Sequence, residues 1–312
     1  MVTETHERVR APEETLDKRK LRIQRRWSSA IFKHALLIFW TLIVLFPIYW
    51  MVMTSFKDSH EWVTWPPRWY PHDPTIYNYR QIFYFGGESG TLRREASEQP
   101  YTIWKGIADS SFIAAMASVI AVILGSSLAY AISRFGVGGK KFPEAVLTIR
   151  MLPPIVIAVP FLIWFPLIGL FDTYTGLILV YIATTLPFVI WMMLSFIEEV
   201  PKELEFAGRM MGAGRIFTLR KVVFPLVASG MVVTLLFTFI LCWSEFLLAL
   251  TLTQPKVSTL PILLNKFQSA VEGRLYGPQA AIGTVITIPV VVLGFLIQKH
   301  LVKGFSFGMI RK

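Results

Sequence analysis

The chain has 312 residues, of which 54% are hydrophobic and 16% are charged. An ordinary soluble domain carries about 25% charged residues, so this composition argues against a water-soluble enzyme and against a disordered chain. The formal net charge is +11, but the basic residues lie between apolar runs rather than along one face, which argues against nucleic-acid binding. The chain has one cysteine, Cys242, which excludes an intrachain disulfide and a zinc site built from thiolates. These features indicate a membrane protein.

Six apolar stretches are long enough to cross a bilayer as helices, which takes about 20 residues. In chain order they are 35–56, 110–133, 151–171, 173–197, 225–253 and 276–298. The third is expected to begin earlier, near Glu144. The first follows 34 residues of charged tail and is too long for the apolar core of a signal peptide, so we expect it to be retained. The sequence predicts an all-α integral membrane protein with six transmembrane helices.

The distribution of basic residues predicts the orientation in the membrane. Of the 31 Lys and Arg residues, 21 lie in the tail 1–34, the connections 134–143 and 198–224, and the C-terminal end; 9 lie in the alternate connections, about 57–109 and 254–278. Cytoplasmic segments carry the excess of Lys and Arg. We therefore expect a basic cytoplasmic tail (1–34), a transmembrane domain (35–312) with two outer loops (57–109 and 254–278), and both termini in the cytoplasm.

The sequence contains no recognisable catalytic constellation. The five His residues are scattered in tails, loops and span ends, and their spacing does not suit a metal site. Neither a nucleophile elbow nor a phosphate-binding loop motif is present. We therefore expect no catalytic residue, no metal site and no ATP bound by this chain.

The connection 198–224 has helical signals of its own. Pro201 suits a first-turn position, and Glu203 and Glu205 fall where the helix dipole favours acids. An apolar face then follows with helical spacing, formed by Leu204, Ala207, Gly208 and Met211. Two interpretations remain open: a short helix that docks into a cleft of another protein, and an interfacial helix that rests on lipid headgroups.

The segment PKELEFAGRMMGAGRIFTLRKVVFP (201–225) resembles the cytoplasmic loop motif of binding-protein-dependent ABC importer permeases, written EAA, three residues, G, nine residues, I-x-L-P. Gly212 aligns with the motif glycine, Ala213 follows it, and Val222, Phe224 and Pro225 take the I, L and P positions. Four further segments resemble the sugar-type, maltose-permease-like branch, and specifically the second permease of the pair: RMLPP, LPFVIW, CWSEFLLAL and LVKGFSFGMIRK. The resemblance covers roughly residues 35–312 and implies the type I importer permease fold.

The resemblance implies a surface in this loop that docks a partner ATPase subunit. Its residues here are Glu203, Glu205, Phe206, Ala207, Gly208, Arg209, Met211, Gly212 and Ala213. Three of them depart from the family pattern, since Phe206 replaces the motif glutamate, Gly208 its second alanine and Met211 a frequent aspartate. Glu205 is one residue early, about 100° round a helix. We therefore expect docking through packing of Phe206, or through a partner with a compensating surface.

Two ionisable residues, Arg150 and Glu245, lie within apolar runs, where charges are costly and face protein or water. Glu245 belongs to Trp243-Ser244-Glu245-Phe246, where relatives usually have Asn in place of Ser244. We expect Arg150, Trp243, Ser244 and Glu245 to line the translocation path or its gate. Alternatively, Glu245 braces helices through Arg150 or a partner permease, and Arg150 extends to the membrane surface.

Taken together, the resemblance implies one permease subunit of an ATP-driven importer of a carbohydrate or polyol, working by alternating access in a bacterial-type plasma (inner) membrane. The implied partners are a second permease, two cytosolic ATPase subunits that use ATP and Mg, an extracytoplasmic solute-binding protein that the loop 254–278 contacts, and membrane lipid. The alternatives are the same machinery for a non-sugar solute and a stand-alone secondary carrier or channel. A polytopic membrane enzyme would need a cluster of acids or histidines, which the sequence lacks.

Overall fold

The computed structural model describes residues 13–83, 103–139, 141–150, 152–210, 212–269 and 273–308. Side chains are described in these ranges except at 13–29, 143, 147, 149, 150, 266, 268, 269, 273, 274 and 299–308. The chain forms two compact units, Met1–Met53 and Thr54–Lys312, and each is described by itself.

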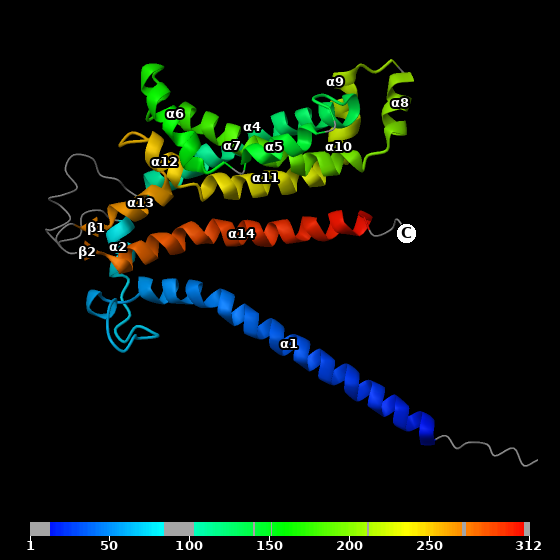
Figure 1. Cartoon of the computed structure of the whole chain (residues 1–312). Helices are drawn as coiled ribbons and strands as arrows, with labels where there is room; N and C mark the ends of the chain where they lie inside the picture. Colours follow the sequence, from blue (N-terminus) through cyan, green and yellow to red (C-terminus); the bar gives the residue numbers. More distant parts are fainter. Residues whose placement is uncertain are drawn as a thin grey trace, which may run out of the picture. The chain divides into compact units, whose positions relative to one another are not determined.

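The described part of the first unit is one long helix, α1, which spans Glu13–Ser55 and ends with two residues of the second unit (Figure 1). Its apolar part, Ala30–Ser55, has the length and hydropathy of a membrane span. The side chains from Ile31 to Tyr49 are exposed, although most of them are apolar. Such a surface suits contact with lipid or with another transmembrane helix rather than with water.

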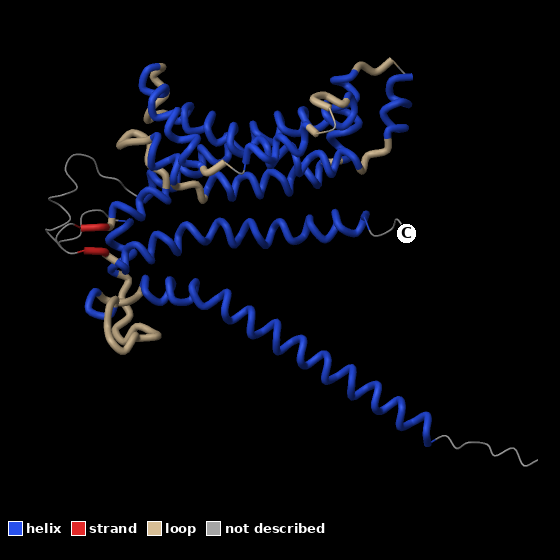
Figure 2. The backbone as a smooth tube through the Cα atoms, in the orientation of Figure 1, coloured by secondary structure: helices blue, strands red, loops and turns tan. Residues whose placement is uncertain are grey.

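Among the described residues of the second unit, the regular structure is helical apart from one short strand pair (Figure 2). Its elements are η1 (Ser59–Glu61), α2 (Tyr77–Phe83), α4 (Ile103–Phe135), α5 (Phe142–Arg150), α6 (Pro154–Leu167), α7 (Tyr174–Glu198), α8 (Lys202–Met210), α9 (Arg215–Thr218), η2 (Leu219–Val223), α10 (Phe224–Leu226), α11 (Ala228–Trp243), α12 (Leu247–Leu252), α13 (Leu260–Lys266), β1 (Gln268–Ser269), β2 (Gly273–Arg274) and α14 (Tyr276–Gly308). The strands pair antiparallel, with Gln268 opposite Arg274.

Helices α4, α7 and α11 pack against one another at the centre of this unit, and α14 packs on α11. The buried face of α4 carries small residues, among them Ala114, Ala121 and Ala129. Small residues let helix backbones approach closely within a membrane. At Gly125 the approach is tight enough that a Cβ would lie 2.5 Å from Cγ1 of Val189 on α7.

Four of the six predicted spans are confirmed as long apolar helices: Ala30–Ser55, Ile103–Phe135, Tyr174–Glu198 and Tyr276–Gln298. The other two predicted spans are not single helices in the part of the chain described. The third consists of α5 and the 14-residue α6, and the fifth of α10, α11 and α12. The count of six membrane crossings therefore stays a prediction.

Proline accounts for two of these interruptions. Pro153 has an extended backbone and Pro154 starts α6, so the chain cannot continue as a helix through both residues. Pro225 lies in α10, just before a bend of 79° between the segments Arg215–Leu226 and Ala228–Trp243. Its missing N–H removes one helical hydrogen bond at the bend.

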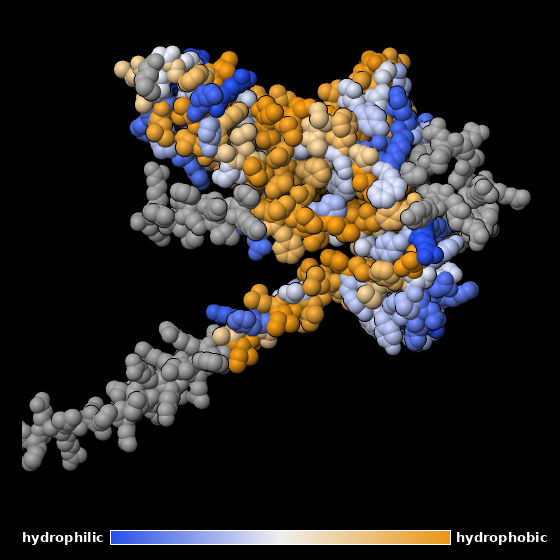
Figure 3. Space-filling view, turned by 180° about the vertical axis from the view of Figure 1, so that it is seen from behind, coloured by the Kyte–Doolittle hydropathy of each residue, from blue (hydrophilic) through white to orange (hydrophobic). Residues whose placement is uncertain are grey.

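Within the second unit, α8, α9 and α10 lie at one end of the long helices, here named the α8 end, and α2, α12, α13 and the strands lie at the other, the α13 end (Figure 1). Apolar side chains cover much of the helix surface between the two ends on the face that Figure 3 shows. Helix α4 begins within the predicted loop 57–109, and α14 begins within the predicted loop 254–278.

Candidate functional site

Residues that favour helix ends flank the short helix α8 on both sides. Pro201 precedes it, and Gly212 follows it with φ +82°, a left-handed conformation that favours glycine. The Gly212 N–H donates to the Arg209 carbonyl (2.9 Å) and the Ala213 N–H to the Gly208 carbonyl (3.1 Å). These bonds use carbonyls that the end of the helix leaves free, so α8 ends sharply and the chain turns back into α9.

All side chains of α8 except those of Glu205 and Gly208 are exposed, and the apolar residues Phe206 and Met210, four residues apart, share one side of the helix. Leu204, Phe206 and Met210 are 45%, 57% and 89% exposed, and the Arg209 guanidinium lies 5.6 Å from the centre of the Phe206 ring. The predicted docking residues Glu203, Ala207, Arg209 and Gly212 are also exposed, whereas Ala213 is half-buried and Gly208 is buried. Met211 lies outside the described residues. Of the apolar face that the helical spacing predicts, Leu204 and Ala207 are exposed and Gly208 is buried, and Phe206 and Met210 add a further pair of exposed apolar residues.

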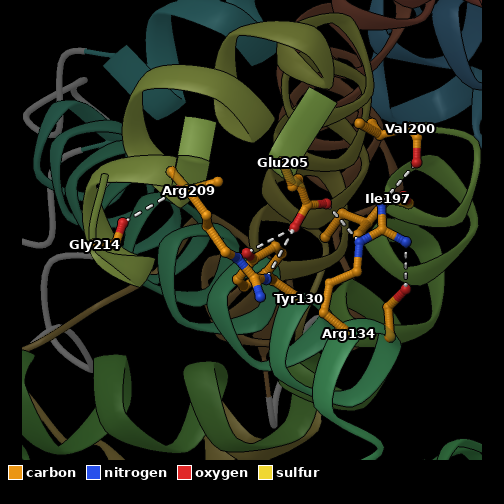
Figure 4. A network of polar contacts seen from close by, with 9 residues as sticks. Tyr130, Arg134, Ile197, Val200, Glu205, Arg209 and Gly214 are labelled. Carbon is orange, nitrogen blue, oxygen red and sulfur yellow. Dashed lines mark hydrogen bonds and ion pairs between the residues drawn. The ribbon is translucent and has the colours of Figure 1, made fainter. Parts of the chain in front are cut away.

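Glu205 points away from this exposed side and into the helix bundle (Figure 4). The residue is 2% exposed, and its Oε1 accepts a hydrogen bond from Arg134 Nε at 2.6 Å, forming an ion pair in which both side chains are buried. The Tyr130 hydroxyl donates to Oε2 at 2.9 Å, and Arg209 lies 4.0 Å from the same oxygen. Glu205, predicted as part of a docking surface, is thus occupied by partners from α4.

Arg134 also connects the end of α7 to this cluster. Its Nη2 donates to the carbonyls of Ile197 (3.0 Å) and Val200 (2.7 Å), near the C-terminus of α7. Carbonyls at a helix C-terminus lack partners within the helix, and an arginine can satisfy them. One guanidinium therefore holds together α4, the end of α7 and α8.

A second polar cluster surrounds Glu245, between α11 and α12. Its carboxylate accepts hydrogen bonds from the N–H groups of Leu248 (2.9 Å) and Ala249 (3.0 Å), in the first turn of α12, and from the Tyr181 hydroxyl of α7 (3.0 Å). The carboxylate thus supplies acceptors for the break in the helix and links it to α7. Glu245 therefore links helices through Tyr181, whereas the sequence suggested Arg150 or a partner permease as its partner.

The remaining residues predicted for the path or gate lie in different surroundings. Trp243 is buried and its Nε1 donates to the Ile286 carbonyl of α14 at 3.1 Å, whereas Ser244 is exposed. Arg150 is the last residue of α5, and its side chain lies outside the described ones. The consecutive residues Trp243, Ser244 and Glu245 therefore lie at the break between α11 and α12.

At the α13 end, acidic side chains fix the loop between α12 and α13. Asp172 accepts hydrogen bonds from the N–H groups of Gln254 (2.8 Å), Lys256 (3.1 Å) and Val257 (3.0 Å), and Asp109 of α4 accepts one from Ser258 (2.9 Å). Among the described residues, no group of three or more side chains could hold a metal ion. The acids at this end act as acceptors for backbone N–H groups.

Residues 121–307 match the family described as the binding-protein-dependent transport system inner membrane component. The match covers more than half of the chain and includes the Glu205 and Glu245 clusters. The chain belongs to this family.

Similarity to individual relatives covers nearly the full length of this transport-system component. It is 35% identical over 277 residues to the trehalose transport system permease protein SugB of Mycobacterium tuberculosis, covering 87% of this chain and 95% of the relative. It is 31% identical to the trehalose/maltose transport system permease protein MalG of Thermococcus litoralis, over 88% and 94% of the two chains. A bacterial ABC transporter involved in alginate import shares the fold, with a TM-score of 0.64, 21% identity and coverage of 86% and 95%.

Sequence reasoning missed the partners of both acids in this transport-system component. Arg134 was counted only among the basic residues that set orientation, and Tyr130 was not considered. A signal for Arg134 existed, because it ends an apolar stretch and belongs to a connection much shorter than 198–224. The anchoring roles of Asp109 and Asp172 had no comparable signal, since both lie at span ends where acids are common.

Proposed function

We propose that this chain is one transmembrane permease subunit of an ATP-driven, binding-protein-dependent importer of a carbohydrate or polyol. The observation that carries the proposal is the exposed apolar face of α8, because a short helix that projects from a membrane bundle with Phe206 and Met210 uncovered suits docking into a cleft of another protein. The carbohydrate class is supported by the names of relatives that match nearly the full chain, which describe trehalose and maltose transport.

In this proposal the α8 end faces the cytoplasm of a bacterial-type cell, with the chain in the plasma (inner) membrane and both termini inside. Two ATPase subunits bind and hydrolyse ATP with Mg, so the chain needs no cofactor of its own, and a second permease completes the solute path. A solute-binding protein contacts the loop 254–278 at the α13 end. Trp243, Ser244 and Glu245, with Arg150, contribute to the path or its gate. ATP-dependent movement of α8 alternates access to the two sides.

Reconstitution tests the proposed function. The complex would be co-expressed with its candidate ATPase and second permease subunits, placed in lipid vesicles, and assayed for ATP hydrolysis with the binding protein loaded from a panel of sugars and polyols. We expect one loaded solute to stimulate hydrolysis and to accumulate in the vesicles. Stimulation by a non-sugar solute would support the alternative substrate class, and transport by this chain without ATPase subunits would support a secondary carrier.

Substitution of Phe206 tests the docking face directly. Phe206→Glu places a charge in an apolar contact, and charges are depleted from the buried core of protein interfaces, so we expect loss of ATPase co-purification and of transport. Val137→Glu is the matched control, because Val137 is an exposed apolar residue in the turn after α4, outside α8. Normal transport by the Phe206→Glu complex would remove the basis for docking through this side chain.

A further inference from the structure

The buried ion pair between Arg134 and Glu205 belongs to a set of contacts that joins α8 to more than one helix of the bundle. Glu205 lies near the start of α8, about 100° round the helix from the exposed Phe206, and its two oxygens contact two residues of α4. The partners Tyr130 and Arg134 are one helical turn apart, so both face α8. The carboxylate of Glu205 therefore forms hydrogen bonds to α4 at two points.

The guanidinium of Arg134 distributes its donors over two further elements. Nε donates to Glu205 on α8, while Nη2 donates to the carbonyls of Ile197 and Val200 at the end of α7. Helices α4 and α7 also pack along their lengths, through the small-residue face of α4. A displacement of α8 that keeps the ion pair intact must therefore move the ends of α4 and α7 together.

Burial and the planar guanidinium make the link between α8 and α4 rigid. Both side chains are almost fully buried, where water does not weaken the ion pair and where loss of one partner leaves an uncompensated charge. The planar guanidinium presents its donors in a fixed fork. At Gly208, on the same side of α8 as Glu205, an added Cβ would lie no closer than 4.0 Å to its nearest neighbours, Ala213, Thr218 and Val222. The ion pair is thus a strong polar link in an otherwise light contact.

We infer that Arg134 and Glu205 are positioning residues that transmit movement of α8 to α4 and α7, so that ATP hydrolysis is coupled to solute transport through this ion pair. This inference rests on the proposed function, and it assigns Glu205 to the bundle rather than to the ATPase surface. Docking and transmission are then separate properties of α8, with Phe206 on the docking side and Glu205 on the transmitting side.

The test compares solute transported per ATP hydrolysed in reconstituted complexes that carry Glu205→Gln, Arg134→Gln or both. Each single change should lower this ratio by about tenfold or more, because a broken buried pair leaves a charge unpaired. The double variant should be no worse than either single variant, since both remove one interaction. The amount of ATPase subunit that co-purifies should not change.

Two matched controls and a conservative variant complete the design. Glu199→Gln and Arg220→Gln neutralise exposed charges at the same end of the bundle and should leave the ratio unchanged. Arg134→Lys keeps the charge but loses the fork, and it should fall between wild type and Arg134→Gln; it also serves if Glu205→Gln does not fold. An unchanged ratio in the single variants, or loss of ATPase binding in Glu205→Gln, would overturn the inference.

A measurement on the purified chain separates this inference from the proposed function. Glu205→Gln should increase hydrogen exchange of the α8 amides by several-fold, because the helix loses its link to α4, while Glu199→Gln should not. Unchanged exchange would overturn the inference even in a chain that transports. If instead exchange increases but no loaded binding protein stimulates the wild-type complex, the proposed function fails and the link of α8 to α4 stands without a role in coupling.

Discussion

Several carboxylates in the described part of the chain accept hydrogen bonds from backbone N–H groups at helix ends and loops. Glu245 accepts from two N–H groups of α12, Asp172 from three in the following loop, and Glu61 from the N–H of His72. Backbone groups that leave regular structure inside or near a membrane need partners, because lipid offers none. These three acids lie where helices break or end, and each carboxylate offers two oxygens as acceptors there.

Glu245→Gln should destabilise the protein. The N–H of Leu248 donates to Oε1, whereas the N–H of Ala249 and the Tyr181 hydroxyl donate to Oε2, so an NH₂ group in place of either oxygen leaves at least one N–H group of α12 without its acceptor. We expect a loss of about 1–3 kcal/mol in the free energy of unfolding, the range for a buried donor that loses its partner. Denaturation of the purified chain in detergent, followed by tryptophan fluorescence, measures it.

Tyr181→Phe is the matched control for Glu245. It removes one of the three hydrogen bonds to the carboxylate and leaves the N–H groups of α12 satisfied. The loss should be smaller, about 0.5–1.5 kcal/mol, as for a single hydrogen bond. A Tyr181→Phe variant less stable than Glu245→Gln would contradict the view that Glu245 mainly serves the helix break.

At the scale of elements, the sequence predicted the long helices and missed the breaks. Four spans follow from apolar length alone. The interruptions at Pro153 and Pro225 could not be predicted with equal force, because proline in a membrane helix produces either a kink or an end. The orientation of α8 depended on a tertiary contact, since Glu205 turns inward to a partner 71 residues earlier in the chain. Helical spacing groups Gly208 with Leu204, Ala207 and Met211 on one face, but it does not indicate which of them a partner elsewhere in the chain will bury.

The hydrogen bonds that Asp172 accepts should hold the backbone of the loop between α12 and α13 in place. Asp172 has φ +54°, and its N–H also donates to the Leu252 carbonyl at 3.0 Å. Asp172→Asn preserves a residue that tolerates this backbone conformation but removes one acceptor oxygen. Hydrogen exchange at Gln254, Lys256 and Val257, followed by mass spectrometry of the peptide that contains them, should rise roughly tenfold, since local opening becomes easier.

Lys256→Gln is the control for this loop. It removes a nearby exposed charge and keeps every backbone hydrogen bond to Asp172. Exchange in this variant should equal that of the wild type. If both variants exchange alike, charge in the loop rather than the Asp172 anchor determines its order.

At the scale of the whole molecule, the two ends of the second unit differ in the residues that they expose, and this difference bears on the orientation of the chain in the membrane. The α8 end presents the exposed apolar residues Phe206 and Met210, and the excess of 21 against 9 Lys and Arg residues predicts that this end faces the cytoplasm. We therefore expect the exposed residues Met210 at the α8 end and Pro255 at the α13 end to lie on opposite sides of the membrane. The native thiol, Cys242, is buried and does not interfere with labelling from outside.

Cysteine labelling decides this orientation. Pro255→Cys and Met210→Cys would be expressed separately and exposed, in intact cells whose outer layers admit it, to a maleimide that does not cross the plasma membrane. We expect strong labelling of Pro255→Cys and only background labelling of Met210→Cys, because α8 faces the cytoplasm; permeabilised cells should label both. Val63→Cys, at an exposed position in the other predicted outer connection, should behave like Pro255→Cys. Labelling of Met210→Cys in intact cells would place α8 outside, where cytosolic ATPase subunits cannot reach Phe206, and the importer function would fail with it.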